Sequence, residues 1–466
     1  MGRGDRSKLR QWILTVAGVL PCLFTSCASR PQAGSIDLEL PPSYQESSLP
    51  VPQLVESLKA LFPVPNLQRS IDRALAHNRD LKESAARLEE AGFNVRESRA
   101  PLFPSLTATG GASRSQGNSA GAGFNAGSFI VDRYSAGLDA QWELDIWGRI
   151  RAGVTASSRN ADAIAADYAA ARRSIAAQTA QAYFTLVSET QLLALTQRRL
   201  KSFQDTFALV DRRYEAGLTG FSEASLARTD VETTRAQLSE RTNARDQAAR
   251  ALALLTGSYP TKSSVAKSFP SLSRGVSTGV PSSLLRDRPD LNAAYLRILA
   301  ADANVTVAHA ALFPSFSLTG SAGRQSARLS DLARAGFDVW SLGAGLTAPI
   351  VDGGRLRAQL GAANARTRQA VARYEATALN ALREVEDALG SETFLREREN
   401  FTRQALKAAK NAEEGVRRSY ENGLVEILTL LDAQRRAFAT EESLITIRTL
   451  RYQNRVSLAL ALGKAL

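Results

Sequence analysis

The residue with the clearest chemistry in this sequence is Cys27, which stands just after an apolar run from Trp12 to Phe24. Basic residues precede the run and small residues flank the prospective cleavage site, a pattern typical of a secretory signal too short to remain as a membrane helix. The last residues of the signal resemble a bacterial lipobox, in which the new amino-terminal cysteine is lipidated. We therefore predict a signal peptide over 1–26 and lipidation of Cys27.

Catalytic and metal-binding chemistry has little support in the rest of the chain. The second cysteine, Cys22, leaves with the signal, which removes disulfides, cysteine catalysis and cysteine-based metal binding. His77 and His309 are the two histidines, and neither has another potential ligand near it in sequence. There is no Gly-rich phosphate loop, His-Glu-x-x-His motif or nucleophile elbow. The sequence predicts no enzyme, no cofactor and no metal site.

The formal net charge of +12 raises the question of a nucleic-acid ligand. The arginines, however, are mixed with acidic residues along helix-like stretches such as 383–399, and they form no basic block. We therefore expect these stretches to be solvated helix faces, and we expect no nucleic acid among the partners. A content of 44% hydrophobic and 7% aromatic residues is that of a folded chain.

The chain repeats its own pattern in two halves. The Leu-Phe-Pro-Ser motif at 102–105 returns at 312–315, and the segment 213–218 corresponds to 419–424. Because the motifs recur in the same order at a nearly constant offset, we interpret the chain as an internal duplication. The predicted segments are an extended arm at 27–66 with no secondary structure, a first repeat at 67–257 (helix 67–100, β-hairpin 105–145, helical hairpin 154–256), a linker at 258–289, and a second repeat at 290–466 (helix 291–311, β-hairpin 315–351, helical hairpin 355–462).

Each Leu-Phe-Pro-Ser motif is followed by residues that alternate with period two between apolar and small or polar types. Four such segments of about ten residues match membrane-spanning barrel strands, although a half-buried soluble sheet alternates in the same way. No later segment has an apolar run long enough for a membrane helix, so a membrane crossing would require strands. Four strands cannot close a barrel alone, because bacterial barrels begin at about eight.

The two longest patterns are helical. Apolar residues recur at steps of three and four from about 154 to 216 without proline or interior glycine, which predicts a helix of roughly 100 Å. Gly217 and Gly423 interrupt the two patterns, and a returning helix follows each. We expect these turns to be the tips of antiparallel coiled-coil hairpins.

The second half carries a specific resemblance. Arg-Pro-Asp-Leu at 288–291, Ala-Asp-Ala at 301–303 and the run from Ala310 to Gly320 resemble the signature of TolC-like outer-membrane efflux proteins. The lipobox-like start and Asp-Gly-Gly-Arg at 352–355 resemble the lipoprotein branch that serves resistance-nodulation-division (RND) pumps. The resemblance covers nearly all of the chain after Cys27.

This resemblance implies an α+β membrane protein. Three chains would form a homotrimer whose twelve-stranded outer-membrane β-barrel, with four strands from each protomer, continues as a periplasmic α-helical coiled-coil barrel. The protein would be anchored by lipid in the outer membrane of a Gram-negative bacterium. A periplasmic adaptor and an inner-membrane RND pump would be its partners, and drugs or other small molecules would pass through it.

The resemblance also places a periplasmic gate at the helix tips. Asp432 falls at one of two positions where the family carries an acidic constriction, and Thr429 occupies the other. Three Asp432 carboxylates around an axis would attract cations and repel one another. Alternatively, Asp432 is a solvated residue or is paired with Arg435 or Arg436. The predicted gate set consists of Asp432 and Thr429 at the two constriction positions, Leu424 and Leu428 as an apolar closure, and Glu223, Tyr214 and Tyr420 near the two turns. Simple coiled-coil packing is the alternative for each residue.

Two other functions remain open from the sequence. The same duct architecture serves type I secretion of polypeptides, and the tunnel pattern does not separate a protein cargo from a drug. A periplasmic coiled-coil adaptor would share the long helical hairpins but would lack the four alternating segments. The lipoprotein start and the signature of the second half favour the efflux channel.

Overall fold

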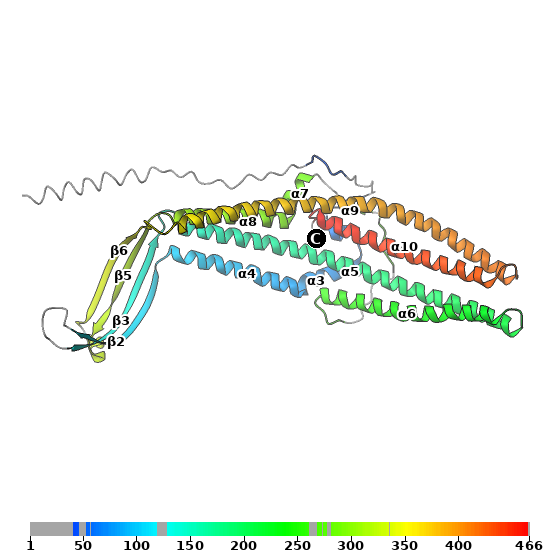
Figure 1. Cartoon of the computed structure of the whole chain (residues 1–466), viewed down its shortest axis with the longest axis horizontal. Coiled ribbons are helices and arrows are strands. Elements are labelled where there is room, and N and C mark those ends of the chain that lie inside the picture. Colours follow the sequence, from blue (N-terminus) through cyan, green and yellow to red (C-terminus); the bar gives the residue numbers. More distant parts are fainter. Residues whose placement is uncertain are drawn as a thin grey trace, which may run out of the picture. The chain divides into compact units, whose positions relative to one another are not determined.

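The computed structural model (Figure 1) describes 41–45, 53–55, 57–118, 128–260, 268–272, 274–276, 281–334 and 336–464. The predicted signal peptide, Cys27 and most of the predicted arm lie outside the described residues. The chain forms two compact units. The sheet unit contains 101–153 and 301–369, and the helical unit contains 36–100, 154–300 and 370–466.

The sheet unit is built on one antiparallel sheet with the strand order β2-β3-β5-β6. The pairing of β3 with β5 joins the two halves of the chain, and β2 and β6 form the edges. The two predicted hairpins are confirmed. The strands run over β2 (Ser105–Asn118), β3 (Ser128–Leu144), β5 (Ser315–Ser326) and β6 (Asp338–Thr347), with a 3-10 helix, η2 (Ala100–Leu102), before β2 and another, η4 (Leu329–Ala333), between β5 and β6.

The first hairpin extends further than its sequence pattern predicts. The segment 116–133, whose Gly, Ser and Asn content is typical of a loop, supplies the last residues of β2 and the first of β3, where Gly117 pairs with Phe129. A side chain on Gly117 would lie 2.6 Å from the Phe129 ring. Pairing between strands therefore extends the hairpin into a region whose glycine content hides the alternation.

The strand register gives the sheet one apolar and one polar face. Leu138 lies opposite Ala108 on β2 and Ala322 on β5, while the next residue, Asp139, lies opposite Thr107 and Ser321. The same separation continues onto β6 as far as Trp340. Beyond that level, the apolar side of the sheet carries two ion pairs, Arg114–Asp132 and Arg324–Asp338. A slip of one residue in any pairing would mix the two faces, so the register is strongly specified if one face is buried in an apolar environment.

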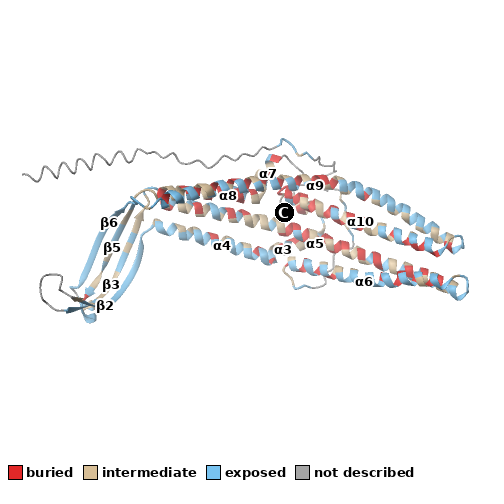
Figure 2. Cartoon of the chain, in the orientation of Figure 1, coloured by how far each residue is buried: buried red, intermediate tan, exposed pale blue. Residues whose placement is uncertain are grey.

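The two long helical hairpins have equal dimensions, as an internal duplication predicts. The outgoing helices, α5 (Arg149–Glu215) and α9 (Arg355–Glu421), have 67 residues each, and the returning helices, α6 (Phe221–Leu255) and α10 (Ile427–Ala461), have 35 each. The predicted hairpins are therefore confirmed. Figure 2 shows buried residues along the inner faces of these helices. Every helix in the described part of the chain is too short or too polar to cross a bilayer.

The prediction of one helix over 67–100 is wrong, because two helices occupy this region. They are α3 (Pro65–His77) and α4 (Arg79–Arg99), separated at Asn78, whose ψ of 136° is not helical. The Asn78 side chain accepts a hydrogen bond from the Leu81 N–H at 3.0 Å and donates one to the Leu255 carbonyl at 3.0 Å. Asparagine is a favoured N-cap, so its side chain begins a new helix here.

The arm and the linker also contain more structure than predicted. In the arm, β1 (Gln53–Val55) pairs in parallel with β4 (Arg274–Val276) of the linker. The arm then forms α2 (Leu58–Leu61), and the linker forms α7 (Pro281–Asp287), which precedes α8 (Pro289–Ala310). The physical reason is burial, because Phe62 is 1% exposed and its ring lies 4.9 Å from that of Phe184 on α5.

A glycine in the left-handed region follows the last helix of each half. Gly257 has φ of 67° and Gly463 has φ of 64°. A Cβ on Gly257 would lie 2.3 Å from the His77 carbonyl oxygen, and a Cβ on Gly463 would lie 2.9 Å from that of Asp287. Both positions thus require glycine for its backbone conformation and for a close backbone contact. The duplication therefore extends to the way each half ends.

Candidate functional site: the tips of the helical hairpins

The two tips share one turn geometry. Gly217 and Gly423 have φ of 71° and 75°, and the residue after each glycine donates its N–H to the carbonyl five residues earlier at 2.8 Å. This is a Schellman-type helix end, which requires a left-handed residue and so favours glycine. The turns predicted from the two glycines are confirmed.

An apolar cluster packs the two hairpins against each other behind the turns. Its largest fully buried members are Phe203, Ile427, Leu430 and Leu431, each at most 1% exposed. Tyr420, which the sequence places in the gate, belongs to this cluster and is 3% exposed. Burial raises the pKa of the Tyr420 hydroxyl, and the nearby charge of Arg213 partly opposes this. Tyr420 therefore packs the tips together from inside the protomer.

A bidentate ion pair joins α10 to α6 next to this cluster. Arg435 donates from Nε to Asp230 Oδ1 at 3.0 Å and from Nη2 to Oδ2 at 2.7 Å. The Asp230 side chain is only 9% exposed, so the carboxylate depends on the guanidinium to replace its lost hydration. The sequence suggests Arg435 only as a partner of Asp432, and it gives no sign of Asp230 as a partner.

Two further contacts link the hairpins. Arg213 on α5 donates from Nη2 to the carbonyls of Tyr420 and Glu421, both at 3.1 Å, and its guanidinium lies 4.5 Å from the Tyr420 ring centre. A cation at the end of α9 is favourable for the helix dipole as well as for the aromatic ring. Gln434 on α10 is fully buried and donates to Thr206 on α5 at 2.9 Å. We call the Arg435–Asp230, Arg213 and Gln434 contacts the tip link.

The residues of the predicted constriction and of the predicted apolar closure lie on the surface of the protomer. Leu424 is 75% exposed and Leu428 is 51% exposed, and Thr429 and Asp432 are exposed as well. Leu428 and Asp432 are four residues apart and lie on one face of α10, whereas Leu424 lies in the turn before that helix. Asp432 accepts a hydrogen bond from Arg436 Nε at 2.7 Å. The alternative pairing with Arg436 is thus present, while the pairing with Arg435 is not.

The predicted gate residues of the first tip make local contacts. Glu223 accepts a hydrogen bond from the hydroxyl of Thr219 in the same turn. Tyr214 is 42% exposed, and its ring centre lies 6.1 Å from that of Phe221. Both contacts shape the α5–α6 turn itself.

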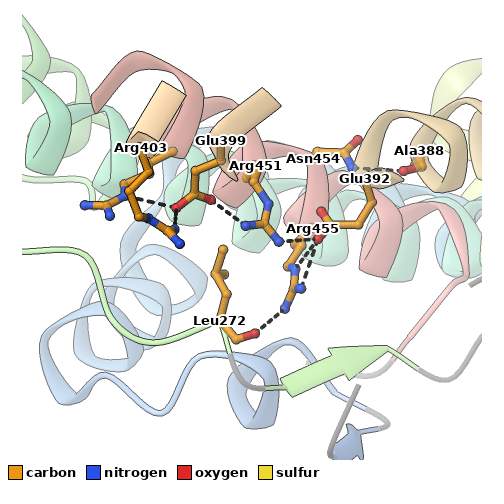
Figure 3. Close-up of polar contacts among 9 residues, drawn as sticks. Leu272, Ala388, Glu392, Glu399, Arg403, Arg451, Asn454 and Arg455 are labelled. Atoms are coloured by element: carbon orange, nitrogen blue, oxygen red, sulfur yellow. Dashed lines mark hydrogen bonds and ion pairs between the residues drawn. The ribbon is translucent and has the colours of Figure 1, made fainter. Parts of the chain in front are cut away.

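A buried charged cluster lies further along α9 and α10 (Figure 3). Arg451 donates to Glu392 at 2.8 Å and to Glu399, and Arg455 donates to Glu392 at 2.9 Å. Burial would raise the pKa of Glu399, but hydrogen bonds from Arg451, Arg448 and Arg403 hold that pKa below its usual value. The expectation that 383–399 is a solvated face is therefore wrong at Glu392 and Glu399, which are 7% and 4% exposed.

This cluster also holds the linker against α10. Arg455 donates from Nη1 to the Leu272 carbonyl at 3.2 Å (Figure 3), and the Tyr452 hydroxyl donates to the Pro270 carbonyl. The ring of Phe269 stacks on Tyr452 with centres 4.7 Å apart. Two residues of α10 that are one turn apart, Tyr452 and Arg455, thus fix the path of the linker. Across the residues that the structure describes, no group of three potential metal ligands comes together.

Together, a four-stranded sheet with one apolar face and two long helical hairpins linked at their tips define a protomer of a TolC-like channel. The model of the outer membrane efflux protein family matches residues 70–258 and 280–464, and the chain belongs to this family. The sheet, the helical hairpins and the order of elements predicted from the resemblance are those of the family's fold.

Individual relatives agree with this assignment. Outer membrane protein OprJ of Pseudomonas aeruginosa is 37% identical over 403 residues, which cover 85% of this chain and 84% of that protein. Cation efflux system protein CusC of Escherichia coli (strain K12) is 31% identical over 445 residues, covering 91% and 95%. The open state of the Neisseria gonorrhoeae MtrE outer membrane channel superposes with a TM-score of 0.82 at 29% identity, covering 93% of this chain and 97% of that one.

Proposed function

We propose that this protein is the outer-membrane exit channel of a tripartite efflux system and acts as a homotrimer. The observation that carries the proposal is the sheet, whose apolar face spans all four strands up to the Arg114–Asp132 and Arg324–Asp338 pairs. In the described part of the chain, the outer edges of the edge strands β2 and β6 have no partner strand. Open edges in lipid leave backbone groups unpaired, so neighbouring chains must close the sheet. Three copies would supply twelve strands, which is within the range of closed bacterial barrels.

The polar face of the sheet would then line a water-filled lumen that continues between the helical hairpins. A periplasmic adaptor and an inner-membrane RND pump would deliver substrate at the tips, where Leu218 and Leu424 are 77% and 75% exposed. The names of the relatives support a role with a pump, since they include the probable efflux pump outer membrane protein TtgC of Pseudomonas putida. The channel would conduct passively and carry out no catalysis.

Deletion and complementation in the source bacterium test this proposal against type I secretion. The deletion strain should accumulate a panel of dyes and drugs, and the intact protein should restore their efflux. Polypeptide secretion should be unchanged. Loss of polypeptide secretion with unaltered drug accumulation would instead support the secretion duct.

Asp432 would form an acidic ring at the entrance of the trimer. Asp432→Asn should leave the trimer intact, lower its cation selectivity and weaken block by multivalent cations roughly tenfold, because three carboxylates near an axis attract such ions strongly. Bilayer recordings check this. Glu414→Gln is the matched control, since Glu414 forms a similar exposed pair with Arg418 on α9. Equal effects of the two substitutions would contradict the acidic ring at Asp432 without contradicting the channel function.

Cys27 would carry the lipid anchor. Growth with a labelled fatty acid should label the protein, and Cys27→Ser should abolish the label while most of the protein still inserts as a trimer. The reason is that twelve strands bury far more apolar surface than acyl chains do. A trimer that is lost with the label would show that the anchor is required for insertion.

A further inference from the structure

The sheet unit contains a cavity of about 350 Å³ at the end of β3, next to the starts of β5 and α9. Its wall includes the turn after β3, with Trp147, and the Leu-Phe-Pro-Ser turn before β5, with Phe313. The cavity therefore lies where both halves of the duplication pass between helix and strand. The predicted gate and the tip link lie in the helical unit, and none of their residues lines this cavity.

One wall of the cavity is a fixed aromatic surface. The rings of Trp147 and Phe313 are stacked, with centres 4.9 Å apart and planes at 26°. Trp147 Nε1 donates to the Pro314 carbonyl at 2.7 Å, which fixes the indole orientation, yet 36% of Trp147 remains exposed. A rigid and accessible aromatic wall is typical of sites that bind flat apolar groups.

The strand residues at the cavity belong mainly to the polar face of the sheet. Glu143 pairs with Ser317, and Ser315 pairs with Thr347, so three lining residues (Glu143, Ser315 and Thr347) share the polar face with Asp139. One lining strand residue, Leu144, has the opposite parity. The cavity therefore adjoins the face that the proposed function assigns to the lumen.

The charges in the cavity are unequally compensated. Arg149 donates to both oxygens of Glu143, at 2.8 and 2.7 Å, and Asp145 accepts from Arg151 and from backbone N–H groups. Arg355 is exposed, and within the described chain it has no ion pair within 4.0 Å. Asp352 interacts with Arg355 electrostatically but directs its oxygens to the backbone N–H groups of Gly354 and Leu356. A guanidinium without a direct carboxylate partner in the described chain thus lines the same cavity as the aromatic wall.

We propose that this cavity is a binding subsite for amphipathic anions with an aromatic body and a carboxylate or sulfonate group. The ring system lies against Trp147 and Phe313, and the anion pairs with Arg355, whose fork of donors matches a carboxylate. Its position facing the lumen rests on the proposed function, whereas the binding itself does not. Three such subsites in a trimer would retain anionic cargo where the helical duct meets the strands.

Equilibrium dialysis with the purified full-length protein tests the subsite, using three probes with the same ring system. 1-Naphthoate should bind more tightly than 1-naphthalenemethanol, and 1-naphthylmethylammonium should bind most weakly. Arg355→Gln should weaken binding of 1-naphthoate roughly fivefold without changing that of the alcohol, as expected for loss of one exposed charge-assisted contact. Trp147→Ala should weaken binding of the alcohol and of 1-naphthoate.

Two matched controls separate the subsite from general effects. Arg357 is exposed on α9 but does not line the cavity, and Trp340 is exposed on β6 away from it. Arg357→Gln and Trp340→Ala should bind all probes as the unmodified protein does. Equal affinity for the three probes, or equal losses in Arg355→Gln and Arg357→Gln, would overturn the subsite. Conductance of the same preparations tests the channel function separately. A protein that conducts but does not bind 1-naphthoate would contradict only the subsite, and one that binds but does not conduct would contradict only the channel function.

Discussion

Replacing Arg451 with methionine is expected to lower the free energy of unfolding by about 3 kcal/mol, because it leaves buried carboxylates without their shared partner. Arg451 is the residue that bridges Glu392 and Glu399, and all three side chains are at most 10% exposed. The remaining arginines reach one glutamate each and cannot replace the bridge. Thermal unfolding of the purified protein, followed by circular dichroism at neutral pH, measures the loss.

Arg403→Met is the control for this prediction. Arg403 also pairs with Glu399, at 2.6 Å, but 56% of its side chain is exposed, so its removal should cost less than about 1 kcal/mol. Equal losses in the two variants would show that burial of the bridge does not matter. A stable Arg451→Met protein would show that the cluster does not stabilise the fold.

The loss of stability caused by Arg451→Met should depend on pH. Because the folded pKa of Glu399 is lowered from 4.5, ionised Glu399 contributes its full stability above that value and loses it as the pH falls through the folded pKa. The difference in stability between the unmodified protein and Arg451→Met should therefore shrink as the pH falls below 4.5. A difference that stays constant at low pH would contradict the assignment of the effect to the ionised carboxylates.

Breaking the tip link should open the channel. A bidentate charged contact contributes about 1.5–3 kcal/mol, so Arg435→Ala should raise the population of separated tips by roughly ten- to a hundredfold. We expect larger single-channel conductance and increased entry of large hydrophilic antibiotics into cells that produce this variant. The buried Asp230 would then also lose its compensating charge, which further favours separation of α6 from α10.

Two further variants make this test specific. Arg436→Ala removes the exposed pair with Asp432, in which the two side chains are 75% and 56% exposed, and it should leave the tips linked. The exchange Arg435→Asp with Asp230→Arg should restore part of the original conductance. If Arg435→Ala and Arg436→Ala behave alike, the link between the hairpins is not what holds the tips together.

The elements with long periodic patterns could be predicted from the sequence. The α5–α6 and α9–α10 hairpins carry dozens of residues at helical spacing, and the strands alternate over about ten residues, so each signal is repeated many times. The three-residue strands β1 and β4 have no such signal, because their pairing depends on chain segments more than two hundred residues apart. The break at Asn78 is a side-chain capping event inside an otherwise continuous helical pattern.

In the candidate functional site, too, local sequence patterns were predictable and tertiary contacts were not. The two tip glycines and the positions of Leu424, Leu428 and Asp432 relative to Gly423 were visible in the sequence. The partners Asp230 and Arg435 were not, since Asp230 lies on a different hairpin and its spacing resembles that of any surface carboxylate. The burial of Glu392 and Glu399 is not visible in the sequence for the same reason, because it depends on arginines that α10 brings next to α9 in the tertiary structure.

The channel function depends on separate copies of this chain closing their sheets into one conducting barrel. Single-channel recording of the purified, detergent-extracted protein in a planar bilayer measures this conduction. We expect stepwise, cation-selective conductance from an assembly with the mass of three chains. A folded single chain that remains soluble without detergent and produces no conductance steps would contradict it.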